Sequence, residues 1–226
     1  SGLFPLRADL LSHKEKLNAY GTAWWGGLSG EITKWDPFRI AWDVNYGSAS
    51  YEDQKMNREG WLASLLLEYK LDWGTPGNFV WYSSGDDGNV KNGSERMPTM
   101  SGCANFMSFM GDGNLAWGTG YNFYDNNLTY AGTWGVGLQI ADVSFVEDLK
   151  HTFRVAYWGG TNSPSMAKYV NSSYGWQNFN NDGNYGEKDG PYLTTNDGLL
   201  EFNLVNSYQI YENLEANLEL SYIVNM

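Results

Sequence analysis

The stretch that decides the fold is GWLASLLLEYKLDW, residues 60–73. Its odd-numbered residues are apolar apart from the Tyr69 hydroxyl, and they include Trp61 and Trp73 near the two ends, whereas its even-numbered residues become charged from Glu68 onward. A period of two indicates a strand with one apolar and one wet face. In a soluble sandwich the apolar face points into a core. In a membrane barrel it points to lipid, with aromatic residues at both headgroup levels and about 9–11 residues per span. We interpret the stretch as a strand of an outer-membrane barrel.

The composition limits the alternatives. Hydrophobic residues make up 42% of the 226 residues, yet mean hydropathy is -0.48. No apolar run approaches the roughly 18 residues of a membrane helix, so a helical membrane protein is excluded. The net charge of -12 argues against nucleic acid as a partner, because that partner requires a basic surface. The single cysteine, Cys103, permits no internal disulfide, and we expect it to be buried and inert.

Other stretches alternate in the same way. The clearest is 38–48, where Phe38, Ile40, Trp42 and Val44 share one face. The same period predicts further strands at residues 17–33, 78–84, 128–141, 151–159, 198–210 and 214–226. Residues 3–11 are either a ninth strand or the end of a loop.

The connections alternate in length. Tight or short connections fall near residues 34–37, 74–77, 142–150 and 211–213, and long polar loops fall near residues 49–59, 85–127 and 160–197. Up-and-down membrane barrels have this pattern of short periplasmic turns and long outer loops, and a Greek-key sandwich has no reason to produce it. We therefore predict an all-β, antiparallel up-and-down transmembrane β-barrel. About eight or nine strands would form a single domain over residues 1–226.

Several separated motifs resemble one family. They are WDPF at 35–38, NGSERMPT at 92–99, SFVEDLKHT at 144–152, GGTN at 159–162, YLTTND at 192–197 and SYQIYENL at 207–214. Together they resemble the homotrimeric outer-membrane porins of Desulfovibrio-type sulfate-reducing bacteria, from about residue 19 to the end. The resemblance implies a trimer of 16-stranded barrels in a Gram-negative outer membrane. It also implies a channel for passive diffusion of small hydrophilic solutes and ions, without catalysis. Because such porins are much longer and barrel chains usually finish on an aromatic residue, we expect this chain to be a segment of one.

Alternate residues of each predicted strand point to opposite faces, inward or outward, and the two sets have different candidate roles. The inward-pointing residues form a pore-lining set that would filter ions by charge. For any one member the alternative is an ordinary solvated polar residue. The set is Arg39, Asp43, Glu68, Lys70, Asp72, Arg154, Glu201, Glu215 and Glu219. Acidic residues outnumber basic ones six to three in this set, which predicts a mild cation preference. The outward parity gives a lipid-facing or trimer-facing set: Ile40, Trp42, Val44, Trp61, Leu65, Leu67, Tyr69, Leu71, Trp73, Leu218 and Leu220.

A Trp-, Tyr- and Gly-rich acidic β-protein also fits a different class. It could be a secreted β-jelly-roll glycoside hydrolase, with carboxylates such as Glu68 and Glu201 flanking a sugar bond, or a carbohydrate-binding module. A glycosidase cleft lines its inner sheet with Trp and Tyr, whereas the inward parity here is mostly small or charged. We therefore favour the channel and expect no enzyme activity.

We expect neither a metal nor a cofactor. His13 and His151 have no second ligand at metal spacing. The stretches DDGN at 86–89 and NDGN at 181–184 resemble calcium loops only weakly, because neither has the required spacing. Residues 103–113 are a candidate constriction loop. Their apolar side chains need burial, for which the trimer contact and the barrel wall are equally good sites. The expected partners are the lipid bilayer, further copies of the chain, and small hydrophilic solutes and ions.

Overall fold

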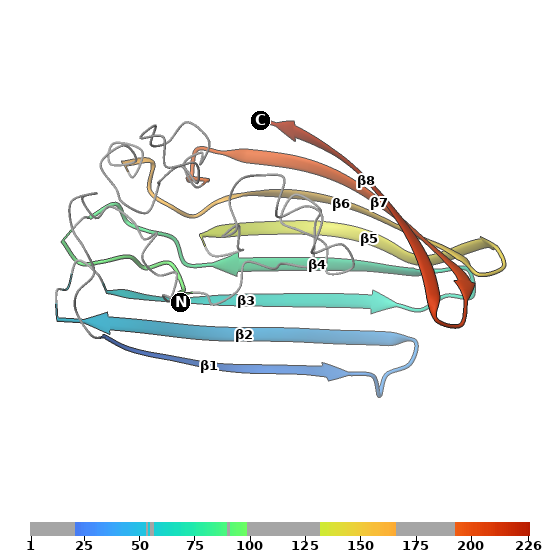
Figure 1. The fold of residues 1–226 in the computed structure, drawn as a ribbon, viewed down its shortest axis with the longest axis horizontal. Helices are drawn as coiled ribbons and strands as arrows, with labels where there is room; N and C mark the ends of the chain where they lie inside the picture. The colour runs from blue at the N-terminus through green and yellow to red at the C-terminus, as the bar shows by residue number, and fades with distance from the viewer. Residues whose placement is uncertain (1–20, 53, 55–56, 90, 99–131, 166–192) are drawn as a thin grey trace.

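The computed structural model describes residues 21–52, 54, 57–89, 91–98, 132–165 and 193–226. Within these residues the chain forms one eight-stranded antiparallel sheet in the order β1-β2-β3-β4-β5-β6-β7-β8 (Figure 1). The strands are β1 Gly21–Ile32, β2 Phe38–Tyr51, β3 Arg58–Tyr69, β4 Thr75–Ser83, β5 Thr133–Val146, β6 Leu149–Gly160, β7 Gly198–Tyr211 and β8 Leu214–Asn225. The predicted all-β, antiparallel up-and-down architecture is confirmed. The possible strand at 3–11, Cys103 with the 103–113 segment, and the 181–184 stretch lie outside the described residues.

The strand order separates the two fold classes considered above. Each strand pairs only with its sequence neighbours, whereas a jelly roll requires Greek-key connections between two packed sheets. The jelly-roll alternative is therefore not supported by the described part of the chain. Across the same residues, no helix is long and apolar enough to cross a membrane.

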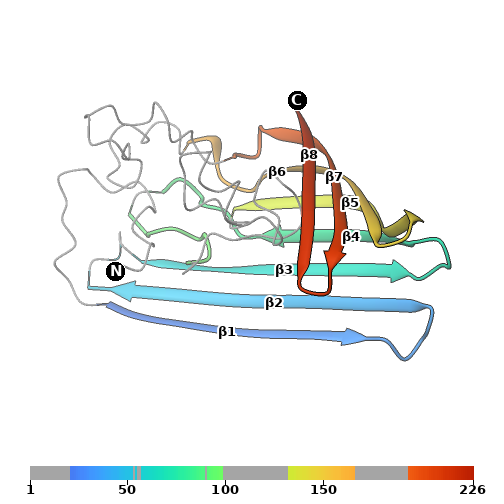
Figure 2. The same cartoon turned by 45° about the vertical axis from the view of Figure 1, so that its right-hand side comes forward.

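The sheet is strongly curved and open. Figure 2 shows β7 and β8 turned steeply relative to β1 to β4, whose axes are closely aligned with one another. Among the described strands no ladder joins β1 to β8, so these two strands are the edges of the sheet. The predicted closed barrel is therefore not formed by the described strands alone.

The register sorts the side chains between two faces. In the β2–β3 ladder, Trp42 lies opposite Leu65 and Asp43 lies opposite Ser64, so apolar residues meet apolar residues and polar residues meet polar ones. We call the face that carries Trp42 and Leu65 the apolar face. The face that carries Asp43 and Ser64 is called the mixed face.

Several strand ends differ from the sequence-based expectation. β3 ends at Tyr69, because the Lys70 amide donates to the Pro37 carbonyl and the Leu71 amide donates to the Gly74 carbonyl. Lys70, Leu71, Asp72 and Trp73 consequently lie in the turn after β3 rather than in the strand. β2 continues to Tyr51, and β5 continues to Val146 through two register shifts, so the connections expected at 49–59 and 142–150 are shorter than predicted.

Candidate functional site

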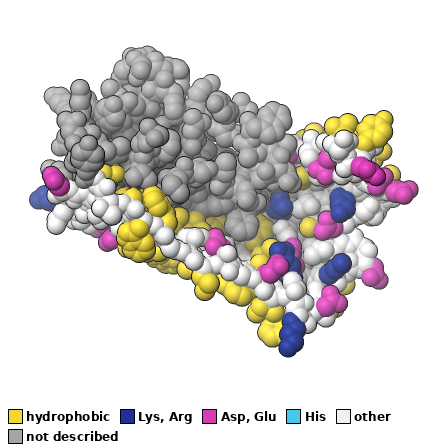
Figure 3. Space-filling model, turned by 60° about the horizontal axis from the view of Figure 1, so that its bottom comes forward, with side chains coloured by type: hydrophobic (Ala, Val, Ile, Leu, Met, Phe, Trp, Pro, Cys, Tyr) yellow, Lys and Arg dark blue, Asp and Glu magenta, His cyan; other side chains and the backbone are white. Residues whose placement is uncertain are grey.

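The apolar face is a wide exposed hydrophobic surface. Leu67, Val44, Val136, Leu220 and Leu138 are between 40% and 57% exposed. Figure 3 shows hydrophobic side chains running along the sheet, with Lys, Arg, Asp and Glu gathered toward its right-hand end. Soluble monomers rarely expose large contiguous apolar patches, and such patches mark sites of contact with proteins or membranes.

An unbroken aromatic girdle crosses the apolar face near the long loops. Ring pairs join neighbouring strands at centroid distances of 5.2 Å for Trp24–Tyr46, 5.0 Å for Trp61–Tyr82 and 5.7 Å for Trp134–Tyr157. The register joins these pairs to one another, because Tyr46 lies opposite Trp61 and Tyr82 lies opposite Trp134. The girdle therefore passes through β1 to β6 without a gap.

A second group of aromatic residues marks the end of the sheet where the short turns lie. Phe38 and Tyr69 pack edge to face at 4.7 Å, and Trp35, Trp73 and Tyr208 are exposed at the same end. Aliphatic side chains fill the band between the two aromatic groups on this face: Leu28, Val44, Leu65, Leu67, Val80, Val136, Leu138, Val155, Leu204 and Leu220.

The length of this band fits a spanning strand. On β2 the band runs from Phe38 to Tyr46, which is nine residues. A tilted strand needs roughly 9–11 residues to cross a membrane.

The structure places the outward candidates on or beside this face. Val44, Trp61, Leu67, Tyr69, Trp73, Leu218 and Leu220 are exposed, and Ile40, Trp42, Leu65 and Leu71 are half-buried. Sequence reasoning missed the tyrosines of the girdle, Tyr46, Tyr82 and Tyr157, as a group. Their alignment depends on the register of strands that are far apart in the sequence.

The mixed face carries a polar belt near the turns. Arg39 donates to Glu31 at 3.0 Å and to Glu68 at 2.6 Å. The Gln139 amide donates to Glu68 at 2.7 Å, and Nε of Arg154 donates to the Gln139 carbonyl oxygen at 3.4 Å. The polar belt therefore links charged groups of β1, β2, β3 and β6 through one uncharged residue of β5.

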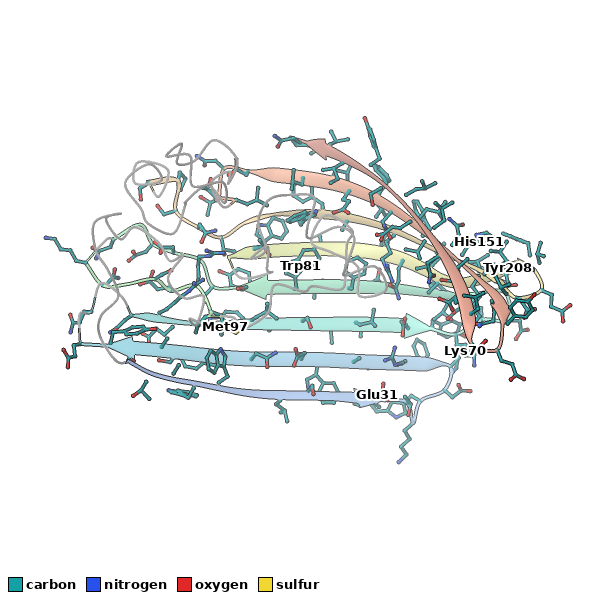
Figure 4. All side chains as sticks on the ribbon, viewed as in Figure 1. Glu31, Lys70, Trp81, Met97, His151 and Tyr208 are labelled. Carbon is teal, nitrogen blue, oxygen red and sulfur yellow. The ribbon has the colours of Figure 1, made fainter. Side chains whose placement is uncertain are left out.

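The polar belt follows one register line across seven strands. Each member lies opposite the next in the ladders of the sheet: Arg39, Glu68, Gly77, Gln139, Arg154, Asn203 and Ser221. On the far side, the Asn203 amide donates to Glu219 at 2.7 Å and to Ser221 at 3.1 Å. Figure 4 shows Glu31 and Lys70 toward the end with the short turns, together with His151 and Tyr208.

The structure brings only some of the pore-lining candidates together. Arg39, Glu68, Arg154 and Glu219 belong to the polar belt. Asp43 accepts a hydrogen bond from Asn45 at 2.6 Å farther along β2. Glu201 is buried on β7, Glu215 is exposed on β8, and Lys70 and Asp72 lie in the turn after β3. Sequence reasoning missed Gln139, Asn203 and Ser221, which belong to the belt because of register. It also missed Glu31, which joins the belt through its ion pair with Arg39.

The other half of the mixed face corrects an expectation. The inward parity was expected to be mostly small or charged, yet near the loops it carries a buried apolar cluster of Phe79, Trp81, Ala156, Trp158 and Leu199. Phe79 stacks on Trp81 with 6.1 Å between the ring centroids, and the ring centroids of Trp81 and Trp158 are 6.3 Å apart. Trp81 also donates to the Thr133 hydroxyl at 3.0 Å. The long run of apolar residues 79–82 was the available signal, since it is apolar on both faces.

Hydrogen bonds tie the described loop segments above this cluster to one another. The Asn162 side chain accepts from the Asp86 amide at 2.9 Å and donates to the carbonyls of Gly132 at 3.2 Å and Leu193 at 2.7 Å. Asn162 is buried, so its three bonds replace bonds to water. One side chain therefore joins the β4–β5 connection to the β6–β7 connection.

A group of acidic residues lies in the loop that follows β4. Asp86, Asp87 and Glu95 each offer an oxygen within 4.8 Å of the others. Burial raises the pKa of the Asp86 carboxyl, and burial together with the charges of Asp87 and Asp86 raises the pKa of Glu95. Sequence spacing did not reveal this group, because Glu95 lies well beyond the DDGN stretch. The expected absence of a metal remains a prediction.

Comparisons with known proteins give little. No family model matches this chain, and no curated protein does. Among solved structures, the chain is similar to the outer membrane channel DcaP of Acinetobacter baumannii, with 9% identity and a TM-score of 0.42. The match covers 95% of this chain and 49% of that one, so the chain spans about half the length of that structure.

Proposed function

We propose that this sheet forms part of the wall of a porin-type channel in a bacterial outer membrane. The apolar face contacts lipid or a neighbouring subunit, and the mixed face lines a water-filled passage. Small hydrophilic solutes and ions cross by passive diffusion, without catalysis and without a cofactor. In line with the resembled Desulfovibrio-type porins, the assembly is a homotrimer.

One observation carries this proposal. An aliphatic band lies between two aromatic groups on one face, and the opposite face carries a belt of linked charges near the short-turn edge of that band. A lipid-exposed barrel wall has this distribution, because hydrocarbon favours the aliphatic band, the headgroup levels favour Trp and Tyr, and water favours the charges. A soluble sheet would bury the apolar face.

The charges of the mixed face support a mild cation preference. Arg39 is paired with two carboxylates, Glu31 and Glu68, so this trio carries a net negative charge. Glu215 and Glu219 add negative charge on β8. At physiological salt the screening length is roughly 8 Å, so an ion that passes close to the wall responds to these groups.

The open edges agree with a larger barrel. In hydrocarbon every backbone N–H and C=O requires a partner, so β1 and β8 each need a further paired strand. The 16-stranded barrel of the resembled porins would supply these strands.

Planar-bilayer recordings test the proposal. Protein extracted from outer membranes is expected to produce discrete conductance steps, with a small reversal potential of cation-selective sign under a salt gradient. Heat-dependent gel mobility of the same sample is expected to report an oligomer. An absence of channels from correctly folded protein would contradict the proposal, and so would release of sugar from xylan or glucan.

A further inference from the structure

Gly77 leaves a gap in the mixed face at the level of the polar belt. It lies between Glu68 on β3 and Gln139 on β5 in the ladders of β4. A Cβ at this position would lie 2.8 Å from the Leu67 carbonyl oxygen, 3.0 Å from Cγ of Glu68 and 3.4 Å from Cγ of Gln139. Because no side chain occupies the gap, Glu68 and Gln139 meet above β4 although their strands are not neighbours.

Gln139 uses both ends of its amide in this gap. Its nitrogen donates to one Glu68 oxygen at 2.7 Å, and its oxygen accepts from Arg154 at 3.4 Å. The other Glu68 oxygen accepts from Arg39 at 2.6 Å. The glutamine amide offers separate atoms for the two contacts, an NH₂ group that donates to the carboxylate and an oxygen that accepts from the guanidinium.

These contacts leave the groups little freedom. Gln139 is 9% exposed, and the Glu68 side chain is 11% exposed, although both lie on the mixed face. Unrestrained Glu and Arg side chains sample many rotamers, which the network prevents. The Glu68 carboxylate is therefore fixed against the wall between β2 and β5.

We infer that Gln139 is a positioning residue for ion passage. It holds the Glu68 carboxylate and the Arg154 guanidinium against the wall, so that both charges act at fixed positions and neither side chain swings into the lumen. This inference rests on the proposed channel function. One uncharged residue, Gln139, links the charges of Glu68 and Arg154 and keeps both at fixed positions.

Substitutions at position 139 distinguish the loss of the Gln139 hydrogen bonds from a change of charge. Gln139→Asn keeps the charge but shortens the side chain by one methylene, so the open-channel current variance is expected to rise several-fold with an unchanged reversal potential. Gln139→Glu places a second carboxylate against Glu68. We expect a larger rise in variance, a lower thermal transition in detergent, and a shift of the reversal potential toward cations.

The decisive test is rescue by a second substitution. In Glu68→Gln with Gln139→Glu, the amide introduced at position 68 can donate to the carboxylate introduced at position 139, which still accepts from Arg154. The double variant is therefore expected to return the variance and the thermal transition nearly to wild-type values. It has the same net charge as the wild type and as Gln139→Asn, so net charge alone would predict equal variance in all three proteins, whereas the link predicts a raised variance in Gln139→Asn only. Glu68→Gln alone is the matched control.

This design distinguishes failure of the inference from failure of the proposed function. If Gln139→Glu changes the variance and the thermal transition equally with Glu or Gln at position 68, the inference is wrong. If the wild-type protein forms no channel, the proposed function fails. The thermal transitions of the wild type, the two single variants Gln139→Glu and Glu68→Gln, and the double variant would still report whether Gln139 links Glu68 to Arg154.

Discussion

The two halves of the mixed face belong to the same strands but do different things. Toward the turns, Arg39, Glu68 and Arg154 belong to one belt of hydrogen bonds and ion pairs. Toward the loops, Trp81 and Trp158 are buried at 3% and 0% exposure. In the described strands the linked charges of the polar belt lie in the half near the turns, whereas the half near the loops is packed around a buried apolar cluster. The half near the loops stabilises the sheet.

The largest expected effect comes from the buried cluster. Trp81→Ala removes a side chain that packs on Phe79 and Trp158 and donates to Thr133, and truncation of a buried Trp costs about 3–5 kcal/mol. Trp61→Ala, on the apolar face, is the matched control and is expected to cost less, because Trp61 is 40% exposed. Denaturant unfolding of protein folded in phospholipid vesicles measures both. Equal costs would show that the half near the loops is not the stabilising half.

The second effect concerns the opposite faces of the sheet. Leu67→Arg places a charge on the aliphatic band, which costs about 2–4 kcal/mol near the membrane midplane. Ser29→Arg adds the same charge on the mixed face opposite Asp43, where water and a carboxylate receive it. We expect the first variant to assemble poorly, as judged by heat-dependent gel mobility, and the second to assemble normally. The reverse outcome would mean that the lipid and water faces have been exchanged.

A smaller effect is expected from the loops. Asn162→Ala removes three hydrogen bonds and leaves the buried Asp86 amide without its acceptor, at a cost of about 1–3 kcal/mol. Hydrogen exchange should therefore accelerate at Asp86 while the amides of β2 remain protected. Acceleration throughout the sheet would show that the loops and the strands unfold as one unit.

The smallest effect is a pH dependence of the loop after β4. Burial raises the pKa of Asp86 above its ordinary value of 3.8, so the folded loop binds a proton more tightly than the unfolded loop does. The stabilisation is complete below the ordinary pKa and is lost as pH rises through the raised pKa. Mild acidification is expected to raise the protection factor of the Gly88 amide, in which the exchange rate is corrected for its intrinsic pH dependence. Asp86→Asn should reduce this rise and leave the part that is due to Glu95, and Glu212→Gln, in the exposed turn between β7 and β8, should leave it intact.

Alternation along the chain determined much of this architecture. Side chains alternate across a strand, so the period of two in residues 38–48 and 60–73 was sufficient to assign an apolar and a polar face to each stretch. The alternating lengths of the connections predicted an up-and-down order, which the ladders confirm. Strand ends were less predictable, because β3 ends where the Lys70 and Leu71 amides find acceptors outside the β3–β4 ladder.

Only the tertiary structure decided which residues share a level of the sheet. Alternation fixes the face of a residue but not its height relative to another strand, because height depends on register. Register placed Tyr46, Tyr82 and Trp134 in one girdle, and it placed Gln139 between Glu68 and Arg154. It also placed Gly77 where the absence of a side chain allows that contact. The sequence alone therefore determined the two faces and the strand order, and the hydrogen-bonded ladders determined the girdle, the buried cluster and the polar belt.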